Sequence, residues 1–394
     1  MAVTGMSARF YATLREAHSP AIRGEVWYDG VRVVDNLPIS GGSVTMRAND
    51  LSRASLSSLQ LTDRDRSLLP DNPLSKIGPY GHEIHIYRGI RYSEVLETDD
   101  GLEETLVGKF RVQTHSANEI WSRPLGDAYH GPEEWVYVGA EVSVDGLDRA
   151  ANIVDARFLS PTEPLPGNDV KAEIIRLCSG IITVDTSNFG TLPTKTPPSS
   201  VVYQEDRGQA IADLAAAIDC RAFVSRAGLL RLEKIEELPD SLIGVTRATP
   251  AVQSIEVETT REGAYNAVVA RGESEGAGYP VQGIAYDTDY NSQMAWGGPF
   301  GQVPYFYSSP VLGTVQSAQL AAQTRLDNLI KGRTRTFTLT GVPDPTLDPN
   351  DKVIVSLPGR DPFPGVIEEI TLPLDPTSLM TIKVVALASV VVEV

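Results

Sequence analysis

The alternation of hydrophobic and polar residues predicts a chain built mainly from short β-strands. Apolar residues recur at every second position over residues 24–28 and 31–34, and Asp29-Gly30 between them is typical of a tight hairpin turn. Further stretches of this kind are 43–47, 53–61, 83–90, 108–112, 134–144 and 152–159. Short strands separated by frequent turn signals favour a barrel or sandwich over residues 1–160.

A change of period after residue 167 predicts a small α+β module over residues 168–240. Asn168 is expected to cap a helix over 169–179, and a second helix is expected to begin at the capping residue Asp206. Apolar residues then recur at three- and four-residue spacing, as one face of a helix requires. A hairpin over 221–233 completes the module.

The stretch from Thr314 to Leu357 organises the second half of the chain. Thr314 is a good N-cap for a helix over 315–331, and the period then switches to the alternation of a strand. The predicted strands of this half are 254–259, 264–271, 334–340, 352–357, 366–372 and 379–387. The pattern predicts a second β-rich region over residues 250–394, with the helix packed on strands 334–340 and 352–357.

Residues 273–310 show no regular period and are rich in glycine and aromatic residues. Long connections of this kind predict an extended arm or a contact loop. Aromatic side chains are favoured in the cores of protein interfaces, so we expect this segment to contact neighbouring subunits rather than a sugar. The expected interface residues are Tyr279, Tyr286, Tyr290, Trp296, Phe300, Tyr305, Phe306 and Tyr307.

The composition is strongly acidic, with a formal net charge of −17 and a pI near 4.8. An acidic chain is poorly suited to wrapping nucleic acid or an anionic membrane, although DNA could pass such a surface without sticking. Residues 1–15 lack the apolar core of a signal peptide, and the apolar residues 384–394 are too few to span a bilayer. We therefore expect no stable membrane association.

The motifs that carry chemistry are weak. The cluster His82-Glu83-x-His85 misses the i, i+4 spacing of a zinc protease, and a strand would place His82 and Glu83 on opposite faces. The one Gly-x-Ser-x-Gly match, Gly272-Glu273-Ser274-Glu275-Gly276, lies in the glycine-rich residues 272–278, which carry two acids and no lysine for a phosphate, so a flexible turn is expected there. Cys178 and Cys220 are expected to be buried free thiols on helices. The sequence therefore predicts no catalytic residue, metal site or cofactor, and a protein that is not an enzyme.

Several short motifs follow one another in an order found in a known family. They are Gly41-Gly42-Ser43-Val44-Thr45, Gly78-x-Tyr80-Gly81-x-Glu83, Leu106-Val107-Gly108-Lys109-Phe110-Arg111, Tyr265-Asn266-x-Val268-Val269, Gly297-Gly298-Pro299-Phe300-Gly301 and Pro345-x-Leu347-x-Pro349-x-Asp351-x-Val353. Over nearly the whole chain, this order resembles the minor tail proteins of long-tailed phages of actinobacteria. More distantly, it resembles the baseplate hub proteins of phage tails and contractile injection machines.

The resemblance implies a virion protein at the tail tip, with tube-type barrels over 1–160 and 250–394 and a peripheral module over 168–240. It implies a homotrimer whose six barrels continue the hexameric tail tube around a channel for DNA. The implied partners are the tail tube or distal tail protein, the tape measure protein and other tail-tip or fibre proteins. Two alternatives stay open, namely a tail-associated enzyme that degrades the cell wall and a carbohydrate-binding receptor protein.

Overall fold

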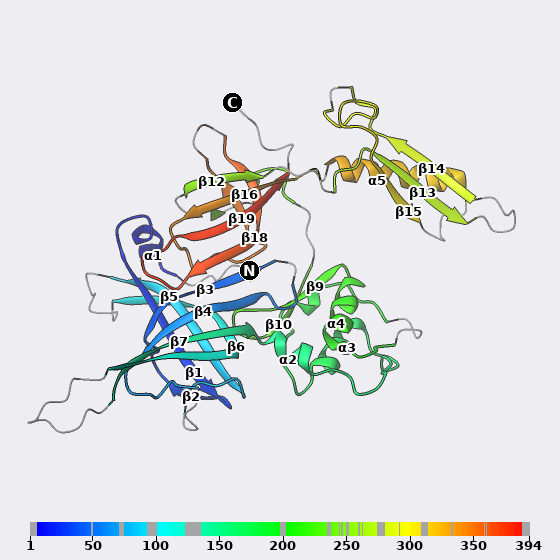
Figure 1. The fold of residues 1–394 in the computed structure, drawn as a ribbon. Coiled ribbons are helices and arrows are strands. Elements are labelled where there is room, and N and C mark those ends of the chain that lie inside the picture. Colours follow the sequence, from blue (N-terminus) through cyan, green and yellow to red (C-terminus); the bar gives the residue numbers. More distant parts are fainter. Residues whose placement is uncertain are drawn as a thin grey trace, which may run out of the picture.

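Strands from the two ends of the chain join in one continuous sheet in the computed structural model (Figure 1). The strand order is β12-β16-β19-β18-β3-β4-β7-β6-β5-β1-β2, with β17 also beside β18 and β11 beside β17. The structure describes residues 6–48, 50–70, 75–92, 101–122, 135–197, 202–234, 238–243, 245, 247–249, 252–258, 261, 263–273, 280–290, 292–308, 314–331, 334–357, 359 and 361–387. No helix in these ranges is long and apolar enough to cross a membrane.

The N-terminal β region forms because alternate residues of its strands are buried against one another. Its elements are α1 (Ala8–Thr13), β1 (Ser19–Tyr28), β2 (Val31–Val34), β3 (Ile39–Arg47), β4 (Ala54–Asp63), β5 (His82–Arg91), β6 (Leu102–Ser122) and β7 (Val136–Asp148). The predicted hairpin turn is confirmed, with Asp29 and Gly30 both at positive φ. The backbone N–H of Leu37 donates to the Gly24 carbonyl at 2.8 Å, which brings the start of β3 to β1 and curls the sheet round.

The C-terminal β region continues the same sheet through antiparallel pairing of β18 with β3, as in Ile370 opposite Met46. Its strands are β11 (Arg247–Ala248), β12 (Val252–Glu258), β16 (Thr334–Gly341), β17 (Lys352–Val355), β18 (Phe363–Pro373) and β19 (Met380–Leu387). Buried side chains of both regions, such as Phe110 and Phe337, belong to one hydrophobic cluster. The fold is therefore mainly β, as the sequence predicts.

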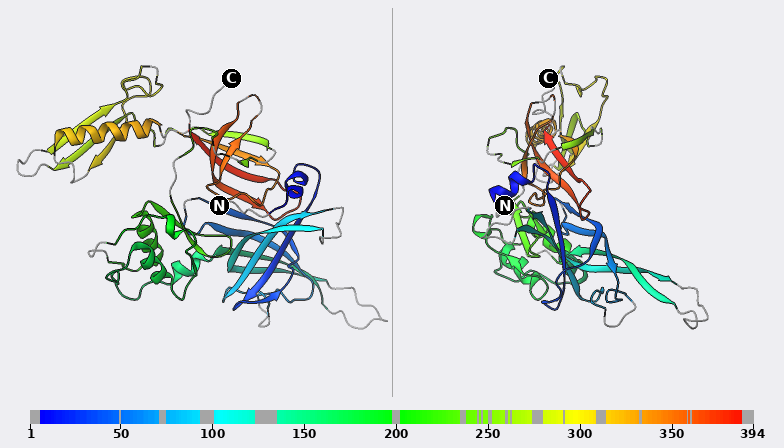
Figure 2. Two further views of the ribbon diagram at one scale, coloured as in Figure 1. Left: turned by 180° about the vertical axis from the view of Figure 1, so that it is seen from behind. Right: turned by 90° about the vertical axis from the view of Figure 1, so that its left-hand side faces the viewer.

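Two smaller α+β units accompany the large sheet (Figures 1 and 2). The first contains α2 (Ala150–Asp155), α3 (Val170–Cys178), β8 (Val184–Asp185), a 3₁₀ turn η1 (Phe189–Thr191), α4 (Arg207–Ala216), β9 (Cys220–Val224) and β10 (Leu230–Lys234). The second contains β13 (Ala267–Glu273), β14 (Pro280–Tyr286), β15 (Pro304–Ser308) and α5 (Val315–Lys331). Each unit has a hydrophobic cluster of its own, so the chain has small cores beside the large one.

Several local predictions differ from the structure. Residues 152–159 hold no strand, because Ala150 and Ile153 share a helical face that is buried in the first small unit. Asp169, not Asn168, caps α3, since its carboxylate accepts the N–H of Ala172 at 2.8 Å. Cys220 begins a strand, although both cysteines are buried free thiols as expected.

The expectation of an irregular arm over residues 273–310 is also wrong, because β14 and β15 lie within it. These strands flank β13, and α5 packs on this sheet rather than on β16 and β17. Helix and sheet approach so closely that a Cβ atom on Gly283 would lie 2.3 Å from the Ala318 backbone. A glycine at this position therefore lets the small-residue face of α5 reach the strands.

Candidate functional site

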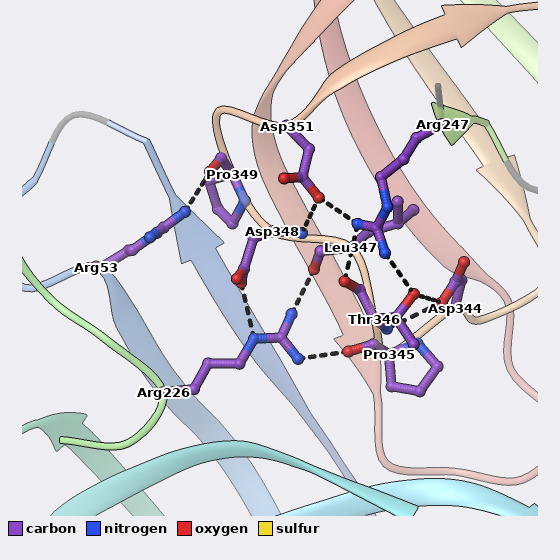
Figure 3. A network of polar contacts seen from close by, with 10 residues as sticks. All are labelled: Arg53, Arg226, Arg247, Asp344, Pro345, Thr346, Leu347, Asp348, Pro349 and Asp351. Atoms are coloured by element: carbon purple, nitrogen blue, oxygen red, sulfur yellow. Dashed lines mark hydrogen bonds and ion pairs between the residues drawn. The ribbon is translucent and has the colours of Figure 1, made fainter. Parts of the chain in front are cut away.

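The loop of residues 344–351, between β16 and β17, is held in shape by its own acidic side chains (Figure 3). Asp344 accepts hydrogen bonds from the backbone N–H and the hydroxyl of Thr346, at 2.9 and 2.7 Å. Asp351 accepts the backbone N–H of Asp348 at 2.9 Å, and Asn350 adopts a φ of 72°. Carboxylates that cap backbone N–H groups in this way favour turns over strands. The loop therefore presents a fixed row of carbonyl and carboxylate oxygens.

Arg226, in the β9–β10 turn of the first small unit, fits this row with its whole guanidinium. Its Nε donates to Asp348 Oδ1 at 2.7 Å, and its two terminal nitrogens donate to the carbonyls of Pro345 and Leu347. Both charged side chains of the pair are largely buried. Five donors in a planar fork suit such a multidentate contact, which a lysine could not reproduce. This arginine fastens the small unit to the C-terminal β region.

Two more arginines reach the same loop from other elements (Figure 3). Arg247 of β11 donates to Asp351 Oδ2 at 2.5 Å and to both oxygens of Thr346 at 3.0 Å. Arg53, which precedes β4 in the N-terminal region, donates to the Pro349 carbonyl. Its guanidinium carbon lies 4.4 Å from the ring centre of Phe223 in β9. We name these three arginines with loop 344–351 the interdomain clasp, because it joins both β regions and the first small unit.

Burial and charge oppose each other in the interdomain clasp. Burial alone would raise the pKa of Asp348, but the cations of Arg226 and Arg53 outweigh it and hold that pKa below its usual value. Burial lowers the pKa of Arg53 and raises the pKa of Asp351. Nearby, burial raises the pKa of Asp148 to about 6, although the N–H groups of Ala54 and Ala150 donate to its carboxylate. The carboxylates and guanidinium groups of the clasp thus neutralise one another. This arrangement is typical of a structural contact between parts of a fold.

Of the residues weighed for chemistry, Glu83 and His85 lie side by side on β5, with His85 Nε2 3.5 Å from the Glu83 carboxylate, but both have other partners. Glu83 forms two hydrogen bonds with Arg149, at 2.9 and 2.7 Å, and His85 stacks on Trp27 with ring centres 5.0 Å apart. Burial raises the pKa of the Cys178 thiol to about 12, so it is a poor nucleophile. In the ranges that the structure describes, no group of three His, Cys, Asp or Glu residues could hold a metal ion.

The aromatic residues expected at an interface divide into two groups on the second small unit. Tyr305 and Tyr307 pack beside α5, against its buried cluster. Tyr286 and Phe306 lie on the opposite face of the three-stranded sheet and are exposed, since residues of a strand alternate between faces. The remaining four expected residues, Tyr279, Tyr290, Trp296 and Phe300, are not on these strands.

Around the exposed face, Trp296 contacts Tyr286 with ring centres 4.9 Å apart, and Tyr290 is 98% exposed. Phe300 lies under Arg261, 4.6 Å from the guanidinium carbon. Tyr279 lies outside the described residues. Of the expected residues, Tyr286, Tyr290 and Phe306 are thus exposed, whereas Trp296 is half-buried beside Tyr286.

The arginines of the interdomain clasp were missed by sequence analysis. Regular Pro and Asp spacing marks loop 344–351 in the sequence, but no motif near Arg53, Arg226 or Arg247 indicates that these arginines converge on it. The one available signal is the number of acids in so short a loop, because buried carboxylates require cationic partners. Which arginines supply them depends on tertiary structure.

Comparison with known proteins finds similar folds among solved structures but no match by sequence. No family model matches the sequence, and no curated protein matches it. The structure is similar to the 43 kDa tail protein of prophage MuSo2 from Shewanella oneidensis, with a TM-score of 0.54, 15% identity, and coverage of 93% of this chain and 99% of that one.

Two further solved structures are similar at this level. A tail protein from Neisseria meningitidis MC58 gives a TM-score of 0.53 at 11% identity, covering 93% of this chain and 96% of that one. A chain of the Francisella PdpA-VgrG complex gives 0.51 at 9% identity, covering 96% and 59% respectively. This chain therefore has, over nearly its whole length, a fold found in phage tail proteins.

Proposed function

We propose that this protein is a structural hub of a phage tail tip, acting as a homotrimer in the virion. Each copy contributes two β regions, residues 1–160 and 250–394, the second interrupted by the α+β unit of β13–β15 and α5. Three copies then supply the six barrels that a hexameric tube end requires. The module of residues 168–240 lies at the periphery. Closed symmetry also removes sheet edges, such as β2 and β12, that an isolated copy offers to aggregation.

The pairing of β18 with β3 is the observation that carries this proposal. It runs over five residue pairs, from Glu369 opposite Arg47 to Pro373 opposite Ser43, and fuses the two β regions into one sheet. A subunit of a six-membered ring built from three chains needs two such units held at a fixed angle. The interdomain clasp supports the same angle from the side of the first small unit.

The expected neighbours are the tail tube or distal tail protein, the tape measure protein and tail-tip or fibre proteins. The surface we assign to one of them carries the exposed residues Tyr286, Tyr290 and Phe306 and the half-buried Trp296. Replacing Tyr286 and Phe306 with serine should block incorporation into tails, whereas Tyr80→Ser, equally aromatic and exposed elsewhere, should not. Equal incorporation of both variants would remove this assignment.

The channel is expected to be net negative, because the chain carries a charge of −17 and DNA phosphates are repelled by acidic walls. DNA would then pass without specific binding. A mapped channel dominated by lysine and arginine would contradict this part of the proposal.

Location in the virion is the first test. Antibody against this chain should label the tail tip in electron micrographs of intact virions. Turnover of purified peptidoglycan by the isolated protein would instead favour a cell-wall-degrading enzyme. Binding on a glycan array would favour a carbohydrate receptor, and the hub predicts neither activity.

A further inference from the structure

Strands β6 and β7 continue beyond the N-terminal β region as a two-stranded ribbon. Pairing of β5 with β6 ends at Arg111, and pairing of β4 with β7 ends at Ala140. Residues 120–122 pair with residues 136–139, and neither stretch pairs with another strand in the part of the chain that the structure describes. Figures 1 and 2 show this ribbon projecting away from the other strands. Both of its outer edges therefore present backbone groups that a further strand could meet.

A bulge gives the ribbon two different faces. Ile120 pairs with Gly139 and Trp121 pairs with Tyr137, so Val138 has no partner on β6. On one face, the rings of Trp121 and Tyr137 meet edge to face at 5.4 Å. The guanidinium carbon of Arg66 lies 5.4 Å from the Trp121 ring centre and 5.5 Å from that of Tyr137.

The other face of the ribbon is aliphatic and open to solvent. Val136 and Val138 are 51% and 56% exposed, and Ile120 lies on the same side of the ribbon. Trp135, just before β7, is 63% exposed. We name Ile120, Val136 and Val138 on this face, together with Trp121 on the opposite face and Trp135, the ribbon patch, which therefore spans both faces of the ribbon. Large apolar side chains gathered on a projecting ribbon are typical of a contact surface.

The size of the ribbon patch fits one part of a subunit interface. Five large side chains, each exposed by about half, offer on the order of 400 Å² of surface. A stable interface takes about 800 Å² from each partner, so the patch supplies about half of one side. An isolated two-stranded ribbon is also only marginally stable in water, and docking would stabilise it.

We propose that the ribbon patch docks on a second copy of this chain. This inference rests on the proposed trimer and identifies one of its contacts. Two copies that each carry a charge of −17 repel each other. The electrostatic repulsion is smallest where the contacting surfaces are uncharged. No residue of the patch is charged, and beside it Arg66 lies 3.7 Å from the carboxylate of Glu119. In a closed ring each copy gives its ribbon to one neighbour and receives a ribbon from the other.

A lipid surface is the rival occupant, since exposed tryptophans also favour bilayer interfaces. Glu119 and the exposed Glu141 lie on the ribbon beside the patch, and anionic lipid would repel these carboxylates. The open strand edges also suit a protein partner, because lipid offers no hydrogen bonds to backbone groups. The observations therefore favour a second copy.

The test compares two doubly charged variants of the full chain by analytical ultracentrifugation. Val136→Glu with Val138→Glu places two carboxylates in the patch, and the control Leu159→Glu with Leu165→Glu places two at exposed positions away from the edge strands β2 and β12. Matching thermal unfolding curves establish that both variants fold. We expect wild type and control to trimerise and the patch variant to dissociate with an apparent Kd raised about 100-fold.

Each other outcome has a defined meaning. A patch variant that trimerises like wild type overturns the docking inference and leaves the trimer intact. Equal weakening by the control overturns it as well, because added charge alone would then explain the loss. A wild-type chain that stays monomeric contradicts the proposed trimer itself. Flotation of wild type with phosphatidylcholine–phosphatidylserine vesicles, lost in the patch variant, would replace the second copy with a membrane.

Discussion

Replacement of Arg226 with methionine should loosen the first small unit from the C-terminal β region. The change removes three donors and leaves Asp348 buried without its closest cation. Breaking a buried ion pair by removing one partner costs about 3–5 kcal/mol, since the remaining charge is desolvated and uncompensated. We expect the opening free energy of β9 and β10 to fall by about this amount, because these strands carry the arginine.

Hydrogen–deuterium exchange of peptides from β9 and β10 measures this opening free energy directly. The matched control is Arg47→Met, which removes an ion pair with Glu369 of similar length, 3.0 Å, but on the exposed face of β3 and β18. Exposed pairs contribute less than about 1 kcal/mol, so exchange should barely change. A double-mutant cycle with Asp348→Asn should give a coupling energy of about 2 kcal/mol. Equal effects of Arg226→Met and Arg47→Met would refute the reasoning.

Three other substitutions test separate parts of the fold. Val353→Asp should destabilise the C-terminal β region by at least about 3 kcal/mol in urea unfolding and abolish tail assembly, because Val353 is fully buried and the carboxylate would lack a partner. A stable, assembling variant would contradict this.

Glu83→Gln addresses pH: burial opposes ionisation, but His85 and Arg149 lower the pKa of Glu83 to about 2. Its stabilisation, about 3 kcal/mol, is present above pH 4.5 and lost as the pH falls towards 2, so wild type and variant should differ at pH 7 and converge near pH 2. A pH-independent difference would exclude this cause. Gly283→Val should separate α5 from β14 and raise exchange in both, whereas Gly190→Val, with no atom near the added Cβ and no positive φ, should leave them unchanged.

Local sequence signals were sufficient to predict those turns, helices and strands whose formation depends mainly on their own residues. The Asp29-Gly30 turn, helix 315–331 and strand 334–340 have turn or period signals confined to a few residues, and all three are confirmed. The mainly β fold follows from many such strands. The spacing of Ala150 and Ile153 was a helical signal of the same kind, but too short to outweigh the apolar run that follows it.

Predictions that needed tertiary information were less successful. The chain leaves the C-terminal β region after β12 and returns at β16, and the intervening 75 or so residues build a separate unit. Adjacent segments usually pack together, which is why α5 was assigned to β16 and β17 rather than to β13 and β14. The interdomain clasp joins Arg53 to Pro349 across 296 positions of sequence, and no local pattern encodes such a contact.

The number of copies in the assembled tail tip tests the central claim most directly. Symmetry and mass, measured by cryo-electron microscopy of intact tails, should give three copies of this chain arranged around the channel. Each copy should contribute two β regions joined by β18 and β3, so that six units form the ring. A single copy at the tip, or a ring of six copies, would contradict the trimeric hub.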